Sequence, residues 1–551
     1  MPKNVKLVNL IYFITLSVLA CIFLYWHFVI GLTRYFDVDE FAYLFWGYNF
    51  SIGLKPYTDF FFLLPPLFLF PISWIFQMFG RNVTALIMAR ALVFLFFLLS
   101  ALLLYLIAKR TRNHKTALLS VVLFAFLPIP FDKMIEIRPD LLANALSLLG
   151  MYLFLLGEGR KKKFFFLSGL SYALSLGIMP KTFMYLIPVM VLAIYNLFNS
   201  KNIKELFTYF RFFLAPFFLG ALIPVLIILT SAIQSSDLGL AIYSMTKMSS
   251  NVSKVLGAKF YMFPTHFFYP NDTYYGEPGY SMSYVGNLII YVFASIWAVF
   301  SFISFLSHKS RDKCLGEFII GSSFFLNLLA FVKIFPLKHA QYLIPLAPFI
   351  AYYFADFIFA LWRNIEKILF NLYPSYSSLQ PEEVYLEGVA KGIRGVYAGT
   401  NQSCFSIVRS EGRGHLRISI KSAYFLLLFI FLGTAGYRMN TRKMAWNNTY
   451  TLEKVKMILR AVPKNASIFD LTGESTFFKC GYYLCALPYG QFDEALGIHI
   501  PDIANEFKKR DTKFVHVGSA SRLYTIPPMQ ASYIQDNFRT FMEDSSLLIA
   551  K

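Results

Sequence analysis

Charged residues are scarce in this chain. Asp, Glu, Lys and Arg make up 15% of the 551 residues, whereas hydrophobic residues make up 57%. In a soluble domain about a quarter of the residues are charged, and a soluble protein with so few charges would expose large apolar patches to water. The composition therefore predicts a protein that crosses a membrane several times, and it excludes a disordered chain and a coiled coil.

Cysteine is also rare, and several catalytic motifs are missing. Five cysteines are too few for a disulfide scaffold. Cys480 and Cys485 are separated by four residues, so a disulfide bond and two free thiols are both compatible with the sequence. Walker and GxGxxG loops, a GxSxG elbow and an HExxH helix do not occur. The sequence thus gives no support for ATP hydrolysis, dinucleotide chemistry or zinc proteolysis.

Long apolar runs are the main feature that is present. A helix needs about 20 apolar residues to cross the hydrocarbon core, and twelve runs rich in Leu, Phe and Ile approach this length. The candidates lie at 7–31, 60–79, 84–108, 116–131, 139–157, 163–180, 182–198, 211–233, 284–307, 316–335, 341–361 and 421–437.

The formal net charge of +20 is concentrated in short basic clusters between these runs. Such clusters stay on the cytoplasmic side of a membrane, so the charge indicates orientation in a bilayer rather than binding of nucleic acid. The clusters and the N-terminus can all be cytoplasmic only if one of the first three runs does not cross. The clusters lie at 109–115, 160–163, 201–204, 308–313 and 362–420.

The run at 60–79 is the weakest span because Pro65, Pro66 and Pro71 interrupt backbone hydrogen bonding. We expect an interfacial or re-entrant helix there, on the outer side. The alternative is that this run crosses the membrane as an ordinary kinked span and that the N-terminus lies on the other side. The first option predicts eleven spans, a cytoplasmic N-terminus and an extracytoplasmic C-terminus.

This topology divides the chain into four parts. Residues 1–361 form an all-α transmembrane module, 362–420 a cytoplasmic loop, 421–437 the last span and 438–551 an extracytoplasmic domain. The last part holds 26 of the 82 charged residues. Its patterns predict a small α/β domain with helices at 451–461, 503–510 and 529–541 and strands at 467–469 and 513–517.

Three carboxylates follow the first span, at Asp37, Asp39 and Glu40. Acidic groups next to a bilayer are costly to bury, so they suit a general base or a metal ligand in an outer cavity. They also suit a structural role, because Asp37 or Asp39 can cap the following helix and Glu40 can complement its dipole. We expect Asp39 to face the cavity and Glu40 to pair with the dipole or with a cation such as Arg90.

Other ionisable residues are expected at the same face of the membrane. Arg138 offers a planar donor fork that suits phosphate, although Asp140 could simply cap a helix and Lys181 could simply reach toward the interface. Cations on several outer segments could hold the phosphate of a lipid-linked substrate, and a carboxylate beside them could transfer a proton. The set comprises Arg90, Arg138, Asp140, Lys181 and the stretch from Lys338 to Tyr342.

The order of these features resembles a known family. The Asp39-Glu40 pair is followed by the stretch 53–60, Pro65-Pro66-Leu67, Arg138-Pro139-Asp140, Lys181 and the stretch 339–346. This order resembles the GT-C glycosyltransferases that use polyprenyl-phosphate-linked sugars, and within them the protein O-mannosyltransferase and lipid A aminoarabinose transferase superfamily. The resemblance covers roughly residues 1–360.

The resemblance implies an inverting transfer from a polyprenyl-phosphate sugar to an acceptor hydroxyl, with no cofactor and no bound metal. It implies Asp39 as the general base, with Glu40 and Asp140 as further acidic site residues. The donor phosphate would be held by outer-facing cations and their neighbours. These are Lys181, Arg138, His339, Arg90, Tyr342 and, because Leu64 replaces a polar residue usual in the family, Lys55.

Two other functions remain as alternatives. A transporter or flippase of lipid-linked glycans would carry ionisable groups in mid-membrane and inverted repeats, and the sequence shows neither. A scaffold of a cell-envelope complex would explain the C-terminal domain but not the acids after the first span. The acceptor, whether glycan, lipid or protein, cannot be read from the sequence.

Overall fold

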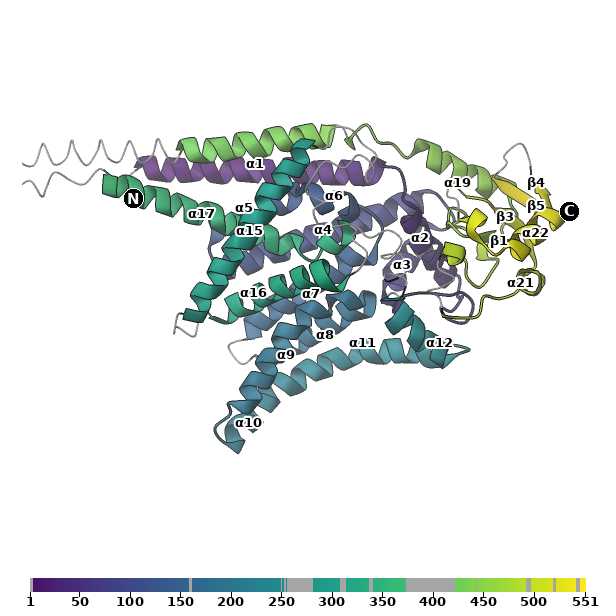
Figure 1. Cartoon of the computed structure of the whole chain (residues 1–551), viewed down its shortest axis with the longest axis horizontal. Helices are drawn as coiled ribbons and strands as arrows, with labels where there is room; N and C mark the ends of the chain where they lie inside the picture. The colour runs from purple at the N-terminus through teal and green to yellow at the C-terminus, as the bar shows by residue number, and fades with distance from the viewer. Residues whose placement is uncertain are drawn as a thin grey trace, which may run out of the picture.

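A computed structural model shows a long bundle of helices with a small sheet domain at one end (Figure 1). It describes the chain from residue 3 onward. The segments outside the described residues are 158–160, 249, 252–253, 255–280, 308–313, 336–339, 373–421, 442, 492–496, 519–521 and 542–545.

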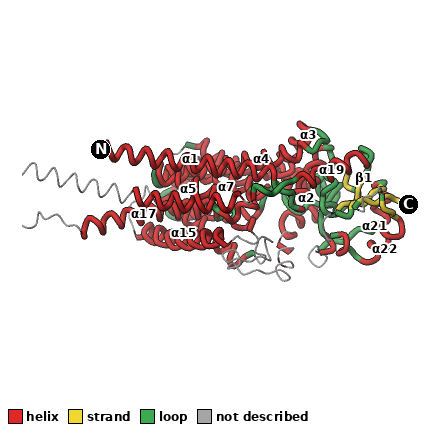
Figure 2. The backbone as a smooth tube through the Cα atoms, turned by 90° about the horizontal axis from the view of Figure 1, so that it is seen from above, coloured by secondary structure: helices red, strands yellow, loops and turns green. Residues whose placement is uncertain are grey.

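Most of the bundle helices are long because their sequences are apolar and seldom interrupted by helix-breaking residues. Seen from above, most of them run along the long axis of the molecule (Figure 2). Their bounds are α1 Lys3–Thr33, α4 Thr84–Thr111, α5 His114–Phe126, α6 Pro128–Met134, α7 Pro139–Leu156, α8 Lys162–Ile178, α9 Phe183–Phe198, α10 Ile203–Tyr209, α11 Ala215–Ile233, α12 Leu238–Tyr243, α15 Ser281–Ser307, α16 Cys314–Leu329 and α17 Ala347–Leu372. A last helix spans Ser422–Thr441.

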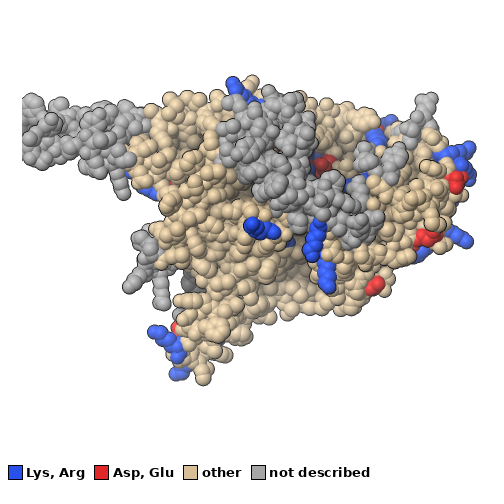
Figure 3. Space-filling model, viewed as in Figure 1, with Lys and Arg blue, Asp and Glu red and all other residues tan. Residues whose placement is uncertain are grey.

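Within the described ranges, eight helices are long and apolar enough to cross a membrane. The other three expected spans contain α5, α8 and α17. A broad surface of the bundle carries few charged side chains, whereas Lys, Arg, Asp and Glu gather on the sheet domain and Lys and Arg at the far tip beside α10 (Figure 3). The chain is an integral membrane protein.

Close packing between spans depends on small residues. A Cβ atom on Gly169 of α8 would lie 1.9 Å from the carbonyl oxygen of Phe217 in α11, and one on Gly220 of α11 would lie 1.9 Å from that of Phe166. The two glycines therefore let the backbones of α8 and α11 touch, as is typical of helix pairs in membranes.

One expected span is divided in two. The run 116–131 forms α5, which ends at Phe126, and the separate short helix α6, which begins at Pro128. The break occurs because Pro128 lacks the N–H that would continue α5 and restricts the residue before it. The short α6 leads into the loop 135–138, which carries two of the charged residues discussed below.

The run 60–79 also differs from a span. It contains a 3₁₀ turn at Pro66–Phe68 and the helix α3, Leu69–Phe79, of 11 residues. At 1.5 Å per residue α3 is about half the thickness of a hydrocarbon core. It lies with α2, Val38–Ser51, at the end of the bundle next to the sheet domain (Figure 1). This placement supports a helix that does not cross, and the side of the membrane stays a prediction.

The C-terminal domain is the predicted small α/β domain. Its five-stranded sheet has the order β2-β1-β3-β5-β4, with β1 parallel to β2 and β3, and with β5 antiparallel to β3 and β4. The strands are β1 Ser467–Asp470, β2 Lys479–Cys480, β3 Thr512–His516, β4 Phe538–Thr540 and β5 Leu547–Ala550. The helices are α19 Thr449–Ala461, α21 Ile503–Arg510 and α22 Pro528–Asn537.

The expected helix 529–541 is wrong at its end. The helix α22 stops at Asn537, and the next three residues form β4. The register pairs Phe538 with Ala550 of β5, so pairing with the next strand replaces the last helical turn. A helical pattern within 529–541 does not reveal this pairing, because the partner strand lies outside the segment.

The sheet domain is attached to α2 by hydrogen bonds at β2 and at the segments on either side of it. The side chain of Asn49 donates to the carbonyl of Phe478 at 3.2 Å and accepts from the N–H of Cys480 at 2.9 Å. The indole of Trp46 donates to the carbonyl of Cys485 at 3.2 Å. Cys480 and Cys485 form a disulfide bond, with their Cα atoms 5.9 Å apart. The disulfide loop therefore holds the domain in place on α2.

The expected orientation gives a labelling prediction. In a background with Cys21, Cys314 and Cys404 replaced by Ser, Met529→Cys should react with a membrane-impermeant maleimide in intact cells. Asn113→Cys should react only after permeabilisation, because the basic cluster at 109–115 holds its end of the bundle in the cytoplasm. Met529 is 87% exposed and Asn113 is also exposed, so a difference in reactivity reports the side of the membrane. Equal labelling of both in intact cells would contradict the topology.

Candidate active site

The N-terminus of α2 begins with a capping box. Asp37 is the N-cap, and its carboxylate accepts the N–H of Asp39 at 2.9 Å. Glu40 reaches back to accept the N–H of Asp37 at 2.9 Å. These bonds satisfy amides that have no partner within the helix. Asp37 is thus the capping acid, and the capping geometry turns the side chain of Asp39 away from its own helix end.

Glu40 pairs with Arg90 of α4, in agreement with the expectation for this residue. Both side chains are almost fully buried, at 0% and 1% exposure. The carboxylate oxygens of Glu40 lie 3.0 Å from Nε and 2.7 Å from Nη2 of Arg90, which is bidentate geometry. Arg90 also donates to the carbonyls of Arg34 and Tyr35. Its donors are thereby taken up by protein oxygens, an arrangement that supports a structural role rather than contact with a phosphate.

Asp39 is the most exposed acid of this group. Its side chain is 46% exposed, and its Oδ2 lies 2.6 Å from Nη1 of Arg138. Its Oδ1 lies 3.7 Å from Nη2 of Arg522, which comes from the C-terminal domain. Partial burial acts to raise the pKa of Asp39, but the two guanidinium groups outweigh this effect and hold the pKa well below the usual aspartate range. Asp39 is therefore ionised at any physiological pH.

Arg138 links Asp39 to a second carboxylate. Its Nε lies 3.4 Å from Oδ2 of Asp140, in the first turn of α7. Asp140 in turn forms an ion pair with Lys181, which lies in the 3₁₀ turn Pro180–Thr182 before α9. The ammonium of Lys181 also lies 4.7 Å from the ring centre of Tyr342, a cation–π distance. A line of alternating charges thus runs from Asp39 through Arg138 and Asp140 to Lys181.

Glu136 connects this line to the first span. It accepts from Arg34 at 2.7 Å and from Lys133 at 2.7 Å, and it lies 3.6 Å from Arg138. Lys133 reaches Asp37 at 3.4 Å. Ion pairs join five cations and four carboxylates of the described residues into one network. The Glu40–Arg90 pair adjoins it through hydrogen bonds with backbone atoms of Asp37 and Arg34, which brings the set to six cations and five carboxylates. This pairing explains how so many charges can be buried at one place. The members are Arg34, Arg90, Lys133, Arg138, Lys181, Arg522, Asp37, Asp39, Glu40, Glu136 and Asp140.

The remaining predicted site residues lie elsewhere or outside the described residues. Lys55 is in an exposed turn where its backbone N–H donates to Asp59 at 2.7 Å, and no contact of its side chain with the network is seen. His339 lies outside the described residues. The described residues contain no group of three metal-ligating side chains, and the expectation of no metal stays a prediction.

The sequence reasoning missed Arg522 entirely. The carboxyl ends of the parallel strands β1 and β3 carry Asp470 and His516 side by side. Asp470 accepts the N–H groups of Thr472, Gly473 and Ser475 at 2.7 to 3.0 Å, which fixes the loop after β1. The carbonyl of Leu471 in that loop accepts from Nη1 of Arg522 at 2.9 Å. Only this folding of the sheet brings Arg522 to Asp39, and no local signal marks it.

Comparisons with known proteins support the family resemblance and the fold. Residues 64–228 match the family model described as dolichyl-phosphate-mannose-protein mannosyltransferase. The structure is similar to that of ArnT from Cupriavidus metallidurans bound to undecaprenyl phosphate, with a TM-score of 0.57 at 10% identity over 98% of this chain and 97% of that one. The chain has the GT-C fold. No curated protein matches the sequence.

A second GT-C structure is also similar. The oligosaccharyltransferase of Archaeoglobus fulgidus, tethered to an acceptor peptide, matches with a TM-score of 0.50 at 12% identity over 92% of this chain and 68% of that one. At such identities the structural matches establish the fold. Together with the family model they confirm the predicted GT-C resemblance and support a membrane glycosyltransferase that uses a lipid-linked donor.

The site predicts that Glu40 and Asp39 differ in their effect on stability. Glu40→Gln leaves Arg90 buried without its counter-charge, and breaking a buried ion pair costs about 3–5 kcal/mol. Asp39→Asn alters a half-exposed group and should change the melting temperature little. A thermal melt of the two variants in the same detergent tests this difference. If both melt alike, Glu40 is not the structural member of the pair.

Proposed function

We propose that this protein is an inverting glycosyltransferase that moves a sugar from a polyprenyl phosphate to an acceptor hydroxyl on the extracytoplasmic face. The observation that supports this most is the line of charges that starts at the half-exposed Asp39 and ends at Lys181. It places an accessible carboxylate beside two cations at the end of a membrane bundle. That is the arrangement a phosphate leaving group and a hydroxyl nucleophile require.

The donor phosphate would bind at Arg138 and Lys181. Lys181 has three donors and uses one for Asp140, and Nη2 of Arg138 contacts no other described residue in the network. Both cations can therefore donate hydrogen bonds to a phosphate while they keep some of their contacts with carboxylates. Tyr342 closes one side of Lys181. The prenyl chain would lie along the apolar helices, and the sugar would face Asp39.

Asp39 would accept the proton of the acceptor hydroxyl. The hydroxyl oxygen attacks C1 of the sugar from the side opposite the phosphate, the C1–O bond to phosphate breaks, and polyprenyl phosphate leaves. The proton passes to Asp39. Because the pKa of Asp39 is low in the free protein, it is a weak base there, and proton transfer would follow the bond to C1 rather than precede it.

Donor binding would strengthen this base. A phosphate that attracts Arg138 weakens the contact between Arg138 and Asp39, and with less positive charge nearby the pKa of Asp39 rises. Arg522, 3.7 Å away, would keep the carboxylate in position during this exchange. The transporter alternative is not favoured, because the charged network lies at the end of the bundle next to the sheet domain.

Replacement of Asp39 tests the base directly. Asp39→Asn keeps the shape but cannot take a proton, and loss of a general base lowers the rate by about 10² to 10⁴-fold. Asp37→Asn should have a much smaller effect, because an asparagine can still cap α2. Transfer would be measured with purified enzyme and a short-chain polyprenyl-phosphate sugar. Wild-type turnover by Asp39→Asn would refute the role of Asp39.

Replacement of Lys181 tests the phosphate site. Lys181→Gln removes a charge-assisted contact with the donor and should raise the KM for the donor by about ten- to a hundredfold. Lys181→Arg should retain part of the affinity. Lys513→Gln, a change at an exposed lysine of the C-terminal domain, is the matched control. An unchanged donor KM in Lys181→Gln would place the phosphate elsewhere.

The low pKa of Asp39 gives a prediction about pH. A carboxylate with a depressed pKa stays ionised until the pH falls below the ordinary aspartate value of about 3.9. The profile of kcat/KM, which reports the free enzyme, should therefore show no acid limb from Asp39 between pH 7 and about 4. The acid limb of kcat, which reports the complex, should lie at higher pH if the donor draws Arg138 away. If the acid limbs of the kcat and kcat/KM profiles coincide, donor binding does not draw Arg138 away from Asp39.

A further inference from the structure

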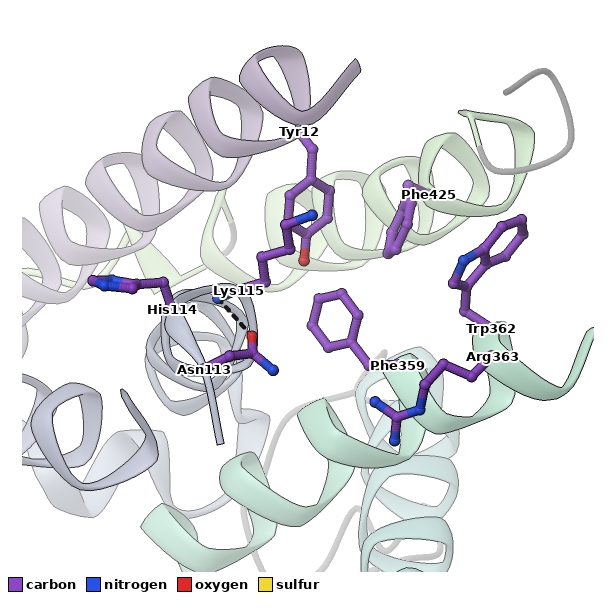
Figure 4. Close-up of a pocket in the computed structure, with 8 residues that line it drawn as sticks. All are labelled: Tyr12, Asn113, His114, Lys115, Phe359, Trp362, Arg363 and Phe425. Carbon is purple, nitrogen blue, oxygen red and sulfur yellow. Dashed lines mark hydrogen bonds between the residues drawn. The ribbon is translucent and has the colours of Figure 1, made fainter. Parts of the chain in front are cut away.

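A cavity lies at the opposite end of the bundle, far from the charged network. It has a volume of about 380 Å³ and lies between α1, α5, α17 and the helix Ser422–Thr441. Figure 4 shows aromatic side chains on its walls and basic side chains at its edge. The walls include Tyr12, Phe359, Trp362 and Phe425, and the edge includes Lys115 and Arg363.

The hydroxyl of Tyr12 points to a missing ligand. Tyr12 is 6% exposed, and its hydroxyl has no hydrogen-bond partner among the described residues. Buried polar groups in folded proteins nearly always have a partner. The ring itself is held firmly, with its centre 4.6 Å from that of Phe425. Figure 4 shows the hydroxyl directed into the cavity, so a group bound there would complete its hydrogen bonding.

The charges around the cavity favour an anion. Lys115 and Arg363 line it, and no acidic residue is among the described residues of the lining. The N-terminus of α5 also lies there, where the side chain of Asn113 accepts the N–H groups of Lys115 and Thr116. The N-terminal end of a helix carries partial positive charge and attracts anions. The polar group expected beside Tyr12 is therefore negatively charged.

The surroundings of the cavity favour a lipid. Next to Tyr12 on α1, Leu10 and Ile14 are 55% and 51% exposed, and next to Phe425, Leu426 and Leu427 are 57% and 68% exposed. In a membrane these side chains face acyl chains. The cavity thus joins a positively charged edge to a surface that suits hydrocarbon, whereas a free inorganic ion would gain nothing from four aromatic walls.

We propose that this cavity binds an anionic phospholipid. Its headgroup phosphate would accept hydrogen bonds from the Tyr12 hydroxyl and from Lys115 or Arg363, and its acyl chains would lie along α1 and the helix Ser422–Thr441. Anionic lipids gather where basic residues lie close to the membrane surface. The bound lipid would join the first and last helices of the bundle, which are far apart in the sequence.

Native mass spectrometry of the full-length protein, delipidated in detergent and titrated with phosphatidylglycerol or phosphatidylcholine, tests the proposal. Phosphatidylglycerol, with its net negative charge, should bind more tightly by about tenfold, because Lys115 and Arg363 repel the choline cation of phosphatidylcholine. Arg363→Gln should remove most of this preference, and Tyr12→Phe, which deletes only the hydroxyl, should reduce it. Lys201→Gln, at an exposed lysine of another cluster at the same end of the bundle, is the matched control.

A second measurement locates the lipid. Phosphatidylglycerol with brominated acyl chains should quench the fluorescence of Trp362, and the quenched fraction should fall in Trp362→Phe. A thermal melt of each variant confirms that it is folded. Equal binding of the two lipids, unchanged preference in both Tyr12→Phe and Arg363→Gln, or displacement of the lipid by millimolar inorganic phosphate would overturn the proposal.

Discussion

The buried pair of Glu40 and Arg90 determines where the rest of the site lies. Through it, α2 is bound to α4, Arg90 holds the carbonyls of Arg34 and Tyr35 at the end of the first span, and Glu40 accepts the N–H of Ile137 at 3.0 Å. Four segments thus meet at one ion pair that has no access to water. Because an unpaired charge in that position would be very costly, the segments cannot separate without loss of the fold.

Asp39 and Arg138 are sequence neighbours of Glu40 and of Ile137, which Glu40 holds. Asp39 precedes Glu40, and Arg138 follows Ile137, so fixing the pair also fixes the 2.6 Å contact between Asp39 and Arg138. Adjacent helical residues point about 100° apart. Once Glu40 points into the bundle, Asp39 must point elsewhere, and it emerges into the half-exposed position beside Arg522. The same helix geometry therefore buries the carboxylate of Glu40 and leaves that of Asp39 accessible.

The C-terminal domain contributes to this arrangement rather than merely following it. Asn49 and Trp46 attach its disulfide loop to α2, and the loop after β1 holds Arg522 toward Asp39. The same helix thus carries the candidate base and the attachment of the domain. A movement of the domain relative to α2 would change the charge around Asp39, so the two parts of the chain form one electrostatic unit.

The sequence by itself determined the membrane class, the helical segments and the set of ionisable residues to consider. Apolar runs of about 20 residues have one stable form in lipid, and acids such as Asp39 stand out in a chain with so few charges. The separation of Asp39 from Glu40 also followed from helical periodicity. The family resemblance rests on the order of the motifs, and it implies a common site for Arg138, Asp140 and Lys181, which the structure joins by ion pairs.

Only the tertiary structure decided which charges pair. Arg90, which the sequence offered both as a partner of Glu40 and as a phosphate ligand, lies against Glu40, and Lys55 is exposed in its turn. Arg522 is nearly 500 residues from Asp39 in the sequence, and its position depends on the register of β1 and β3. A hydrophobic pattern shows which face of a helix is buried, but it does not give the distance between two side chains on different segments. An ion pair depends on that distance to within an ångström. The pairing of charges therefore becomes visible only in the tertiary structure.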